Sequence, residues 1–166
     1  MSQHLYLLRH GNSPMGEGLP DKERILSDLG RQNVSEMGGR LTVKGIKPDM
    51  ILCSTAQRTK MTAQLLMEAM GLSADSICYD DRIYNASLEA LVYLARETEE
   101  DISTLLVIGH NPGLSELVHF GDGESYCKEQ GFYGLTTASF AYLELSVPWS
   151  QFDAGTARVV EILSPR

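Results

Sequence analysis

Short apolar runs alternate along the chain with longer segments that carry hydrophobic residues at helical spacing. The apolar runs predict strands at residues 4–9, 49–53, 76–79, 104–108, 138–145 and 157–163. Most of these runs are continuous, as in strands whose two faces are both buried. Strands that alternate with helices indicate a mainly parallel sheet with helices on both faces. We therefore expect a three-layer α/β sandwich, formed as a single domain over residues 1–166.

Four segments predict helices between these strands. The first runs from a cap at Ser27 to about Lys44, with Leu29, Met37 and Leu41 on one face. The other expected helices start near Ala56, after Ser87, and at Asn111 as a cap with Pro112 in the first helical position. The helix from Ala56 is expected to end at Met70, before Gly71.

The remaining segments predict loops and one hairpin. Residues 12–26 and 119–136 are Gly-rich or polar without clear periodicity, so we expect irregular structure beside the strand ends. Only residues 148–155 separate the last two strands, which is too short for a helical crossover. These strands are expected to form an antiparallel hairpin at the C-terminal edge of the sheet.

Charge and cysteine usage narrow the functional class. The net charge of −8 argues against a nucleic-acid or anionic-membrane partner, although a local arginine cluster could still hold a small anion. Cys53, Cys78 and Cys127 fit neither a disulfide framework nor a zinc motif, which favours reduced thiols. No signal-peptide pattern and no apolar stretch near 18 residues is visible. We expect a soluble, cytoplasmic protein.

Two apolar runs end in a histidine. Arg9, His10 and Gly11 follow the first expected strand, and His110 follows the strand that ends at residue 108. Open α/β sheets build their ligand sites at the carboxyl ends of strands. Arg58 falls in the first turn of the helix that follows another strand. Its side chain is therefore expected at the same edge of the sheet.

These residue types together suit phosphoryl transfer. Arginine side chains match the geometry of phosphate oxygens, and a helix that begins near Asn111 offers backbone N–H groups to an anion. A neutral imidazole is a competent nucleophile near pH 7. We expect His10 to accept the phosphoryl group, with Arg9, Arg58 and His110 holding its oxygens. Ser13 and Asn111 are further candidates for phosphate contacts, and no metal or cofactor is expected.

The sequence resembles the histidine phosphatase superfamily. The resemblance rests on residues 7–13 (LLRHGNS), 26–30 (LSDLG), 54–63 (STAQRTKMTA) and 107–112 (VIGHNP), which occur in the family's order. It implies a histidine phosphatase-like domain over residues 1–166, with catalytic His10, Arg9, Arg58 and His110 and no metal. The short chain and the segment from Gly109 to Gly113 look most like small bacterial protein phosphohistidine phosphatases.

The proton donor of related branches has no clear counterpart here. Residues 80–86 (DDRIYNA) lack the glutamate-containing segment of the mutases, and Asn111 stands where acid phosphatases carry aspartate. Glu17, Asp21 and Asp81 remain candidate donors. An alkoxide leaving group needs such a donor, whereas an imidazole can depart neutral once protonated. The missing acid therefore favours phosphohistidine as the substrate.

Several alternatives stay open. The substrate is expected to be a phosphorylated protein, but a small phosphate ester would use the same pocket, and a protein that binds phosphate with little turnover is a third possibility. A mutase is disfavoured by the missing segments. Ser54 is interpreted as a helix cap and Thr62 as helix packing. The spacings of His4 and His119 match no metal motif.

Overall fold

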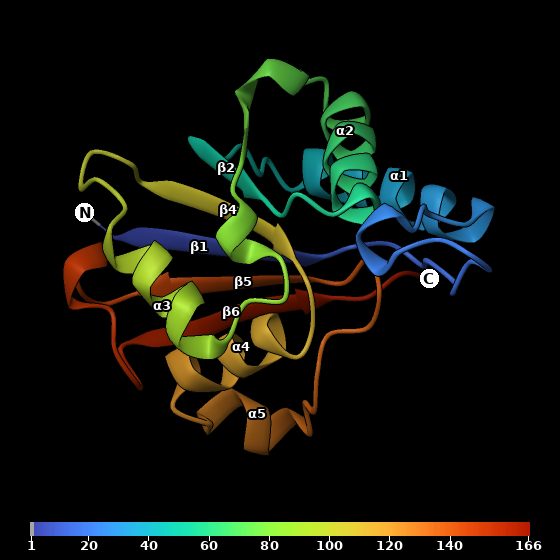
Figure 1. Ribbon diagram of the computed structural model, residues 1–166. Coiled ribbons are helices and arrows are strands. Elements are labelled where there is room, and N and C mark those ends of the chain that lie inside the picture. The colour runs from blue at the N-terminus through green and yellow to red at the C-terminus, as the bar shows by residue number, and fades with distance from the viewer. Residues whose placement is uncertain (1) are drawn as a thin grey trace.

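The computed structural model describes residues 2–166 and places six strands in one mixed sheet (Figure 1). The strands are β1 (Gln3–Arg9), β2 (Met50–Cys53), β3 (Ile77–Tyr79), β4 (Thr104–Gly109), β5 (Phe140–Leu145) and β6 (Ala157–Leu163). Their order across the sheet is β3-β2-β4-β1-β5-β6. The strands from β3 to β1 are parallel, whereas β5 is antiparallel to β1 and to β6. The predicted parallel sheet and its antiparallel edge hairpin are confirmed.

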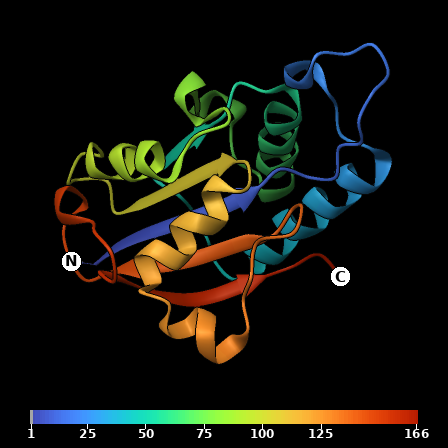
Figure 2. The same cartoon turned by 60° about the horizontal axis from the view of Figure 1, so that its bottom comes forward.

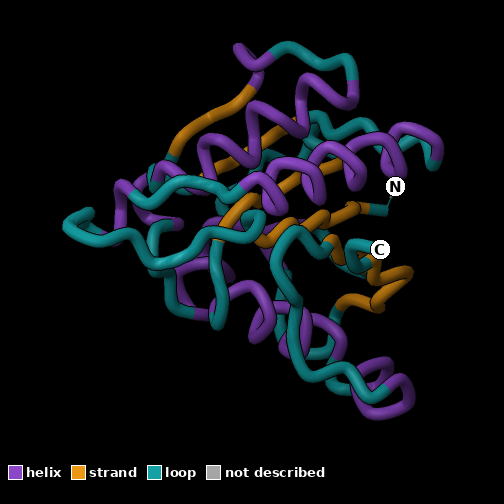
Figure 3. Tube along the Cα trace, turned by 90° about the vertical axis from the view of Figure 1, so that its right-hand side faces the viewer, coloured by secondary structure: helices purple, strands orange, loops and turns teal. Residues whose placement is uncertain are grey.

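Helices cover both faces of this sheet, which confirms the three-layer prediction (Figures 2 and 3). They are α1 (Asp28–Val43), α2 (Gln57–Met70), α3 (Leu88–Arg96), α4 (Gly113–Asp122) and the short α5 (Ser125–Gln130). Helices α1 and α2 pack on one face, and α3 and α4 pack on the other. The helices described are all too short or too polar to span a lipid bilayer.

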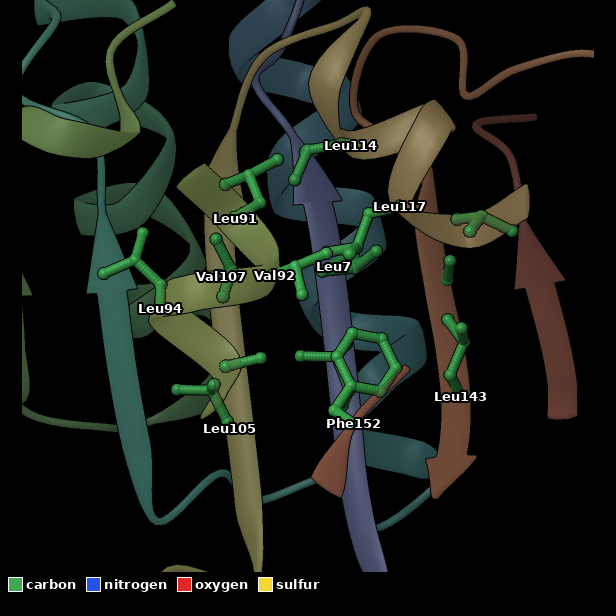
Figure 4. Close-up of a cluster of buried hydrophobic side chains, with 14 of the residues drawn as sticks. Leu7, Leu91, Val92, Leu94, Leu105, Val107, Leu114, Leu117, Leu143 and Phe152 are labelled. Atoms are coloured by element: carbon green, nitrogen blue, oxygen red, sulfur yellow. The ribbon is translucent and has the colours of Figure 1, made fainter. Parts of the chain in front are cut away.

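Alternating strand residues feed two separate hydrophobic cores. Leu7 of β1 points toward α3 and α4, where it meets Leu91 and Leu117 (Figure 4). Leu5 belongs to the same cluster. The intervening strand residues, such as Leu8, pack instead against α1 and α2. Side chains of a strand alternate between its faces, so a continuous apolar run supplies both cores.

Helix α1 begins as expected but buries a different stripe. The Ser27 hydroxyl accepts a hydrogen bond from the backbone N–H of Gly30, so Ser27 is the predicted N-cap. Leu29, however, is 56% exposed, whereas Met37 and Leu41 are fully buried. Leu29 lies eight residues before Met37, which places it about 80° around the helix. The prediction that it shares their face is wrong.

The segment predicted to be irregular at residues 119–136 is partly helical. Helix α4 continues to Asp122, and α5 follows between Gly123 and Gly131, which adopt left-handed conformations with φ of 64° and 65°. Helix α4 also starts later than expected, at Gly113, and Pro112 occupies the N-cap position. Asn111 is therefore no cap. Its amide instead donates to the Leu135 carbonyl at 2.7 Å.

Helices α1 and α2 approach each other closely at Gly38. A Cβ added to Gly38 would lie 2.5 Å from the Cβ of Ala69, whereas a Cβ on the neighbouring Gly39 would meet nothing within 4 Å. The contact between the two helices therefore depends on the missing side chain at residue 38. This matters for the site because α2 carries Arg58.

This difference between neighbouring glycines predicts opposite effects on stability. Gly38→Ala should lower the free energy of unfolding by about 1–3 kcal/mol, because the new methyl group overpacks the interface. Gly39→Ala should raise it by about 0.5–1 kcal/mol, because alanine favours the helix and the position is open. Urea denaturation of both variants checks the pair. Equal effects at the two positions would contradict the proposed contact.

Candidate active site

The two histidines come together at the carboxyl ends of neighbouring parallel strands. Arg9 at the end of β1 pairs with Gly109 at the end of β4, so the next residues, His10 and His110, lie side by side. The backbone N–H of His10 donates to the Gly109 carbonyl at 3.1 Å. The ring centroids are 5.3 Å apart, and each residue is only 6% exposed. The strand register thus fixes their separation.

The ring of His10 is held in one orientation. Its Nδ1 lies 2.7 Å from the carbonyl oxygen of Gly11, and a carbonyl can only accept a hydrogen bond. The ring proton of the neutral imidazole is therefore on Nδ1, which leaves a lone pair on Nε2. The residues directly after β1, His10 to Asn12, form a short segment called the nucleophile loop. Thr62 of α2 supports it, because the Thr62 hydroxyl accepts a hydrogen bond from the Gly11 N–H at 3.1 Å. Its packing role extends to the nucleophile loop.

The nucleophile loop lies directly against the start of α1. A Cβ on Gly11 would lie 2.9 Å from the Gly30 carbonyl oxygen, and one on Gly30 would lie 2.3 Å from the Asn12 carbonyl oxygen. The Ser27 hydroxyl also contacts the Asn12 side-chain oxygen at 2.7 Å. The backbone beside His10 is therefore packed at a distance that only glycine permits.

Two arginines bring positive charge to the histidines. Arg58, in the first turn of α2, is 5% exposed, and its Nη2 lies 3.4 Å from Nδ1 of His110. Arg9 donates to the Leu135 carbonyl at 3.0 Å. Within residues 2–166, the buried Nε atoms of both arginines have no partner. Buried donors are normally satisfied, so these guanidinium groups retain donor capacity for an anion.

Both imidazoles are neutral at physiological pH. Burial lowers the pKa of His10 to about 4, and the nearby Arg58 and Arg9 add to this effect against the hydrogen bond with Gly11. Burial, followed by His10 and Arg58, lowers the pKa of His110 to about 3. Charged forms are disfavoured away from water and beside other cations. The site therefore combines cationic arginines with an unprotonated nucleophile.

The segment from Asn12 to Leu26 covers the arginine side of the site. Its short 3-10 turn (Asp21–Glu23) places the Asp21 carboxylate 3.2 Å from Nη2 of Arg58, and the Asp21 carbonyl accepts from Nη1 at 2.8 Å. The Tyr84 hydroxyl donates to the same carboxylate at 2.6 Å. Nη1 of Arg24 lies 2.8 Å from the other oxygen of the Asp21 carboxylate, Oδ1. A backbone segment predicted to be irregular is thus anchored by side-chain contacts.

None of the three candidate proton donors, Asp21, Asp81 and Glu17, has the surroundings of a general acid. The Tyr84 hydrogen bond, with help from Arg24 and Arg58, lowers the pKa of Asp21 to about 2, so Asp21 is ionised near neutral pH. Asp81 lies 2.6 Å from the Lys22 ammonium group, which lowers its pKa. Glu17 is exposed. Asp21 and Asp81 both act as anchors of the covering segment.

Ser13 and Asn111 lie near the histidines but bond to the protein. The Ser13 hydroxyl donates to the Ile25 carbonyl at 2.6 Å. The Asn111 amide donates to Leu135, and its oxygen accepts from Ser115 at 2.6 Å. Their contact with phosphate stays a prediction. Within residues 2–166, no three His, Cys, Asp or Glu side chains gather as a candidate metal site.

Sequence reasoning missed three residues of the site. Arg24 and Tyr84 come from segments without a periodic pattern, and no motif marks them. Ser54 was interpreted as a helix cap, but Ala56 is the N-cap residue of α2 and Ser54 Oγ lies 2.7 Å from Nε2 of His110. Its position at the end of β2, beside β4, was the available signal. A cavity of about 560 Å³ next to β2 and α3 is lined by none of these site residues.

Comparison with known proteins agrees with this geometry. Residues 5–91 match the family model described as the histidine phosphatase superfamily, branch 1. The chain belongs to the histidine phosphatase superfamily. It is accordingly a phosphatase-type hydrolase, and the matched residues include Arg9, His10 and Arg58.

Similar proteins cover nearly the whole chain. The SixA structure from Agrobacterium tumefaciens is 27% identical, covers 98% of both chains and has a TM-score of 0.84. The SixA structure from Nakamurella multipartitia is 25% identical, covers 99% of this chain and 97% of its own, and has a TM-score of 0.81. The Mycobacterium tuberculosis protein Rv1276c is 27% identical over 96% of this chain and 100% of its own length. These similarities place the chain with the small SixA-like histidine phosphatases.

The lowered pKa of His10 predicts a nucleophile that stays unprotonated well below neutrality. The His10 ring should stay roughly nine-tenths or more unprotonated between pH 8 and pH 5, because burial and the two arginines hold its pKa at about 4. Ring-nitrogen NMR of the uniformly labelled protein follows the protonation directly. A midpoint near the ordinary histidine pKa of about 6.5 would contradict the described burial.

Because the Asp21 carboxylate contacts Arg58, we expect it to weaken the binding of an anion to the same guanidinium group. Asp21→Asn should tighten inorganic phosphate binding roughly three- to tenfold, because it removes a negative charge beside Arg58 and keeps a similar shape. Competitive inhibition by phosphate measures the change. Asp81→Asn is the matched control, because the Asp81 carboxylate is bonded to Lys22 and Thr55. Unchanged binding in Asp21→Asn would rule out this competition.

Proposed function

We propose that this histidine phosphatase hydrolyses phosphohistidine in a partner protein through a covalent intermediate on His10. The proposal rests on one observation above all. The carboxylate that contacts Arg58, Asp21, has a pKa of about 2 and so cannot protonate an alkoxide near neutral pH. A leaving imidazole tolerates this, because it departs as a neutral ring once its other nitrogen carries a proton.

The first step is transfer of the phosphoryl group to the protein. The Nε2 lone pair of His10 attacks phosphorus while the phosphorus–nitrogen bond of the substrate breaks and its imidazole leaves. Arg9, Arg58 and His110 hold the three phosphoryl oxygens, and Ser13 and Asn111 add contacts from the adjoining loops. Phosphoryl transfer depends mainly on positioning and charge stabilisation. The arginines supply that charge without a metal or cofactor.

The second step restores the free protein. Water attacks phosphorus, the bond to Nε2 of His10 breaks, and the ring regains its lone pair. The proton lost by water goes to the departing phosphate or to solvent. Because the His10 proton stays on Nδ1, bonded to the Gly11 carbonyl, the ring needs no reorientation between the two steps.

The names of similar proteins support a phosphorylated protein as the substrate. SixA from Agrobacterium tumefaciens carries the name of a phosphohistidine phosphatase. The mitochondrial serine/threonine-protein phosphatase PGAM5 of Xenopus tropicalis is 34% identical over 65 residues, which cover 39% of this chain and 23% of PGAM5. A cytoplasmic location and a role in signal transduction would suit such a substrate.

Phosphate release from a histidine-phosphorylated carrier protein in EDTA tests the proposal. Wild type should release phosphate at an unchanged rate in the chelator, and His10→Ala should lower the rate about a thousandfold or more because the nucleophile is lost. His119→Ala is the matched control, because His119 lies outside the pocket and contacts the Tyr133 carbonyl. It should retain the wild-type rate.

Other outcomes would redirect the assignment. A chelator-sensitive rate would overturn the metal-independent mechanism. Much faster release from small phosphate esters than from the carrier protein would move the substrate to that class. Tight binding of a phosphorylated peptide without phosphate release would identify a binding protein.

A further inference from the structure

Ser54 directly follows β2, where it is bonded to β4 and to α2 beside the second histidine. Its backbone N–H donates to the Ile108 carbonyl at 3.0 Å, and its carbonyl accepts from the Thr59 hydroxyl at 3.0 Å. The side chain is fully buried, with 0% exposure. The Ala56 N–H donates to its Oγ at 3.3 Å. The hydroxyl oxygen is therefore held at one place beside His110.

The two ring nitrogens of His110 meet different partners. Nε2 lies 2.7 Å from Ser54 Oγ, and Nδ1 lies 3.4 Å from Nη2 of Arg58. A guanidinium group can only donate, so Nδ1 must be the acceptor in this pair. A neutral imidazole then carries its single proton on Nε2. Ser54 Oγ is the acceptor of that proton's hydrogen bond.

We propose that Ser54 is a positioning residue that holds His110 in the Nε2–H tautomer, with the Nδ1 lone pair facing the phosphoryl pocket. The edge of the ring is also restrained by Tyr84, whose ring centroid lies 5.6 Å away. Hydrogen bonds made by one nitrogen commonly fix the tautomer and so the chemistry of the other. Ser54 thereby determines which nitrogen meets the substrate.

This tautomer has a consequence for substrate binding. A lone pair on Nδ1 cannot donate to a phosphoryl oxygen, so His110 must take up one proton there when the phosphoryl group arrives. The imidazolium then donates forward to the phosphoryl oxygen and backward to Ser54. Burial is the largest obstacle to this protonation, Arg58 and Arg9 add to it, and Asp21 favours it. A bound phosphoryl dianion would offset the positive charge of the two arginines and so raise the pKa of His110.

Nitrogen NMR of the histidine rings tests the assignment without any substrate. In free wild type near pH 7, His110 should show a protonated Nε2 and an unprotonated Nδ1. Saturating inorganic phosphate should convert it to the doubly protonated form. A wild-type spectrum with the proton on Nδ1 would overturn the proposal, and so would a ring that stays neutral when phosphate is bound.

Two substitutions of Ser54 distinguish the role of its hydroxyl group from the role of its packing. Ser54→Ala should give a mixture of His110 tautomers and lower kcat about tenfold, the effect of one lost hydrogen bond. Ser54→Thr keeps a hydroxyl and should restore the single tautomer. Thr98→Val is the control, because it removes another buried hydroxyl, bonded to the Leu94 carbonyl, away from the histidines. An unchanged tautomer in Ser54→Ala would overturn the role of Ser54.

The kinetic arm rests on the proposed function, whereas the spectra do not. If phosphohistidine hydrolysis fails but the free protein shows the Nε2–H tautomer, only the substrate is wrong. If hydrolysis succeeds and the tautomer differs, the role of Ser54 is wrong while the function stands. The two failures can therefore be distinguished by experiment.

Discussion

The parallel register of β1, β4 and β2 is the constraint on which the site depends. Their carboxyl ends lie at one edge of the sheet, and each delivers a polar residue directly after a buried strand. These residues are His10, His110 and Ser54, in the order of the strands. Backbone hydrogen bonds between the ends, from His10 to Gly109 and from Ser54 to Ile108, hold the three at fixed spacing. The rest of the site is added around this row.

Positive charge is concentrated in a protein that is acidic as a whole. The chain has a net charge of −8, yet Arg9 and Arg58 lie beside the histidines. Asp21 is the main counter-charge, and it reaches the site from a surface segment instead of from the sheet. The charge of the pocket is therefore set by local contacts and differs in sign from the net charge of the protein.

The sequence predicted the parts of the site that sit next to strands. Arg9, His10 and His110 follow continuous apolar runs, and strand ends are recognisable from pattern alone. Arg58 was placed by its distance from β2. Asp21, Arg24 and Tyr84 could not be placed, because their contacts join residues 37 to 63 positions apart or lie in a segment without periodicity. Such contacts depend on how loops pack, which propensities and motifs do not encode. The same reason explains α5 and the exposed Leu29, whose positions were set by packing and not by local pattern.

The glycine contact between the nucleophile loop and α1 makes these two elements one mechanical unit. Gly11 and Gly30 each exclude a side chain because the opposing backbone lies within 3 Å of where a Cβ would stand. A shift of α1 would carry the His10 backbone with it, so the helix cannot be remodelled independently of the nucleophile. Residues 13–25 and 131–137 differ from α1 in this respect, because each hydrogen bond that joins them to the site residues involves a side chain, as in the bonds from Arg58 to the Asp21 carbonyl and from Arg9 to the Leu135 carbonyl.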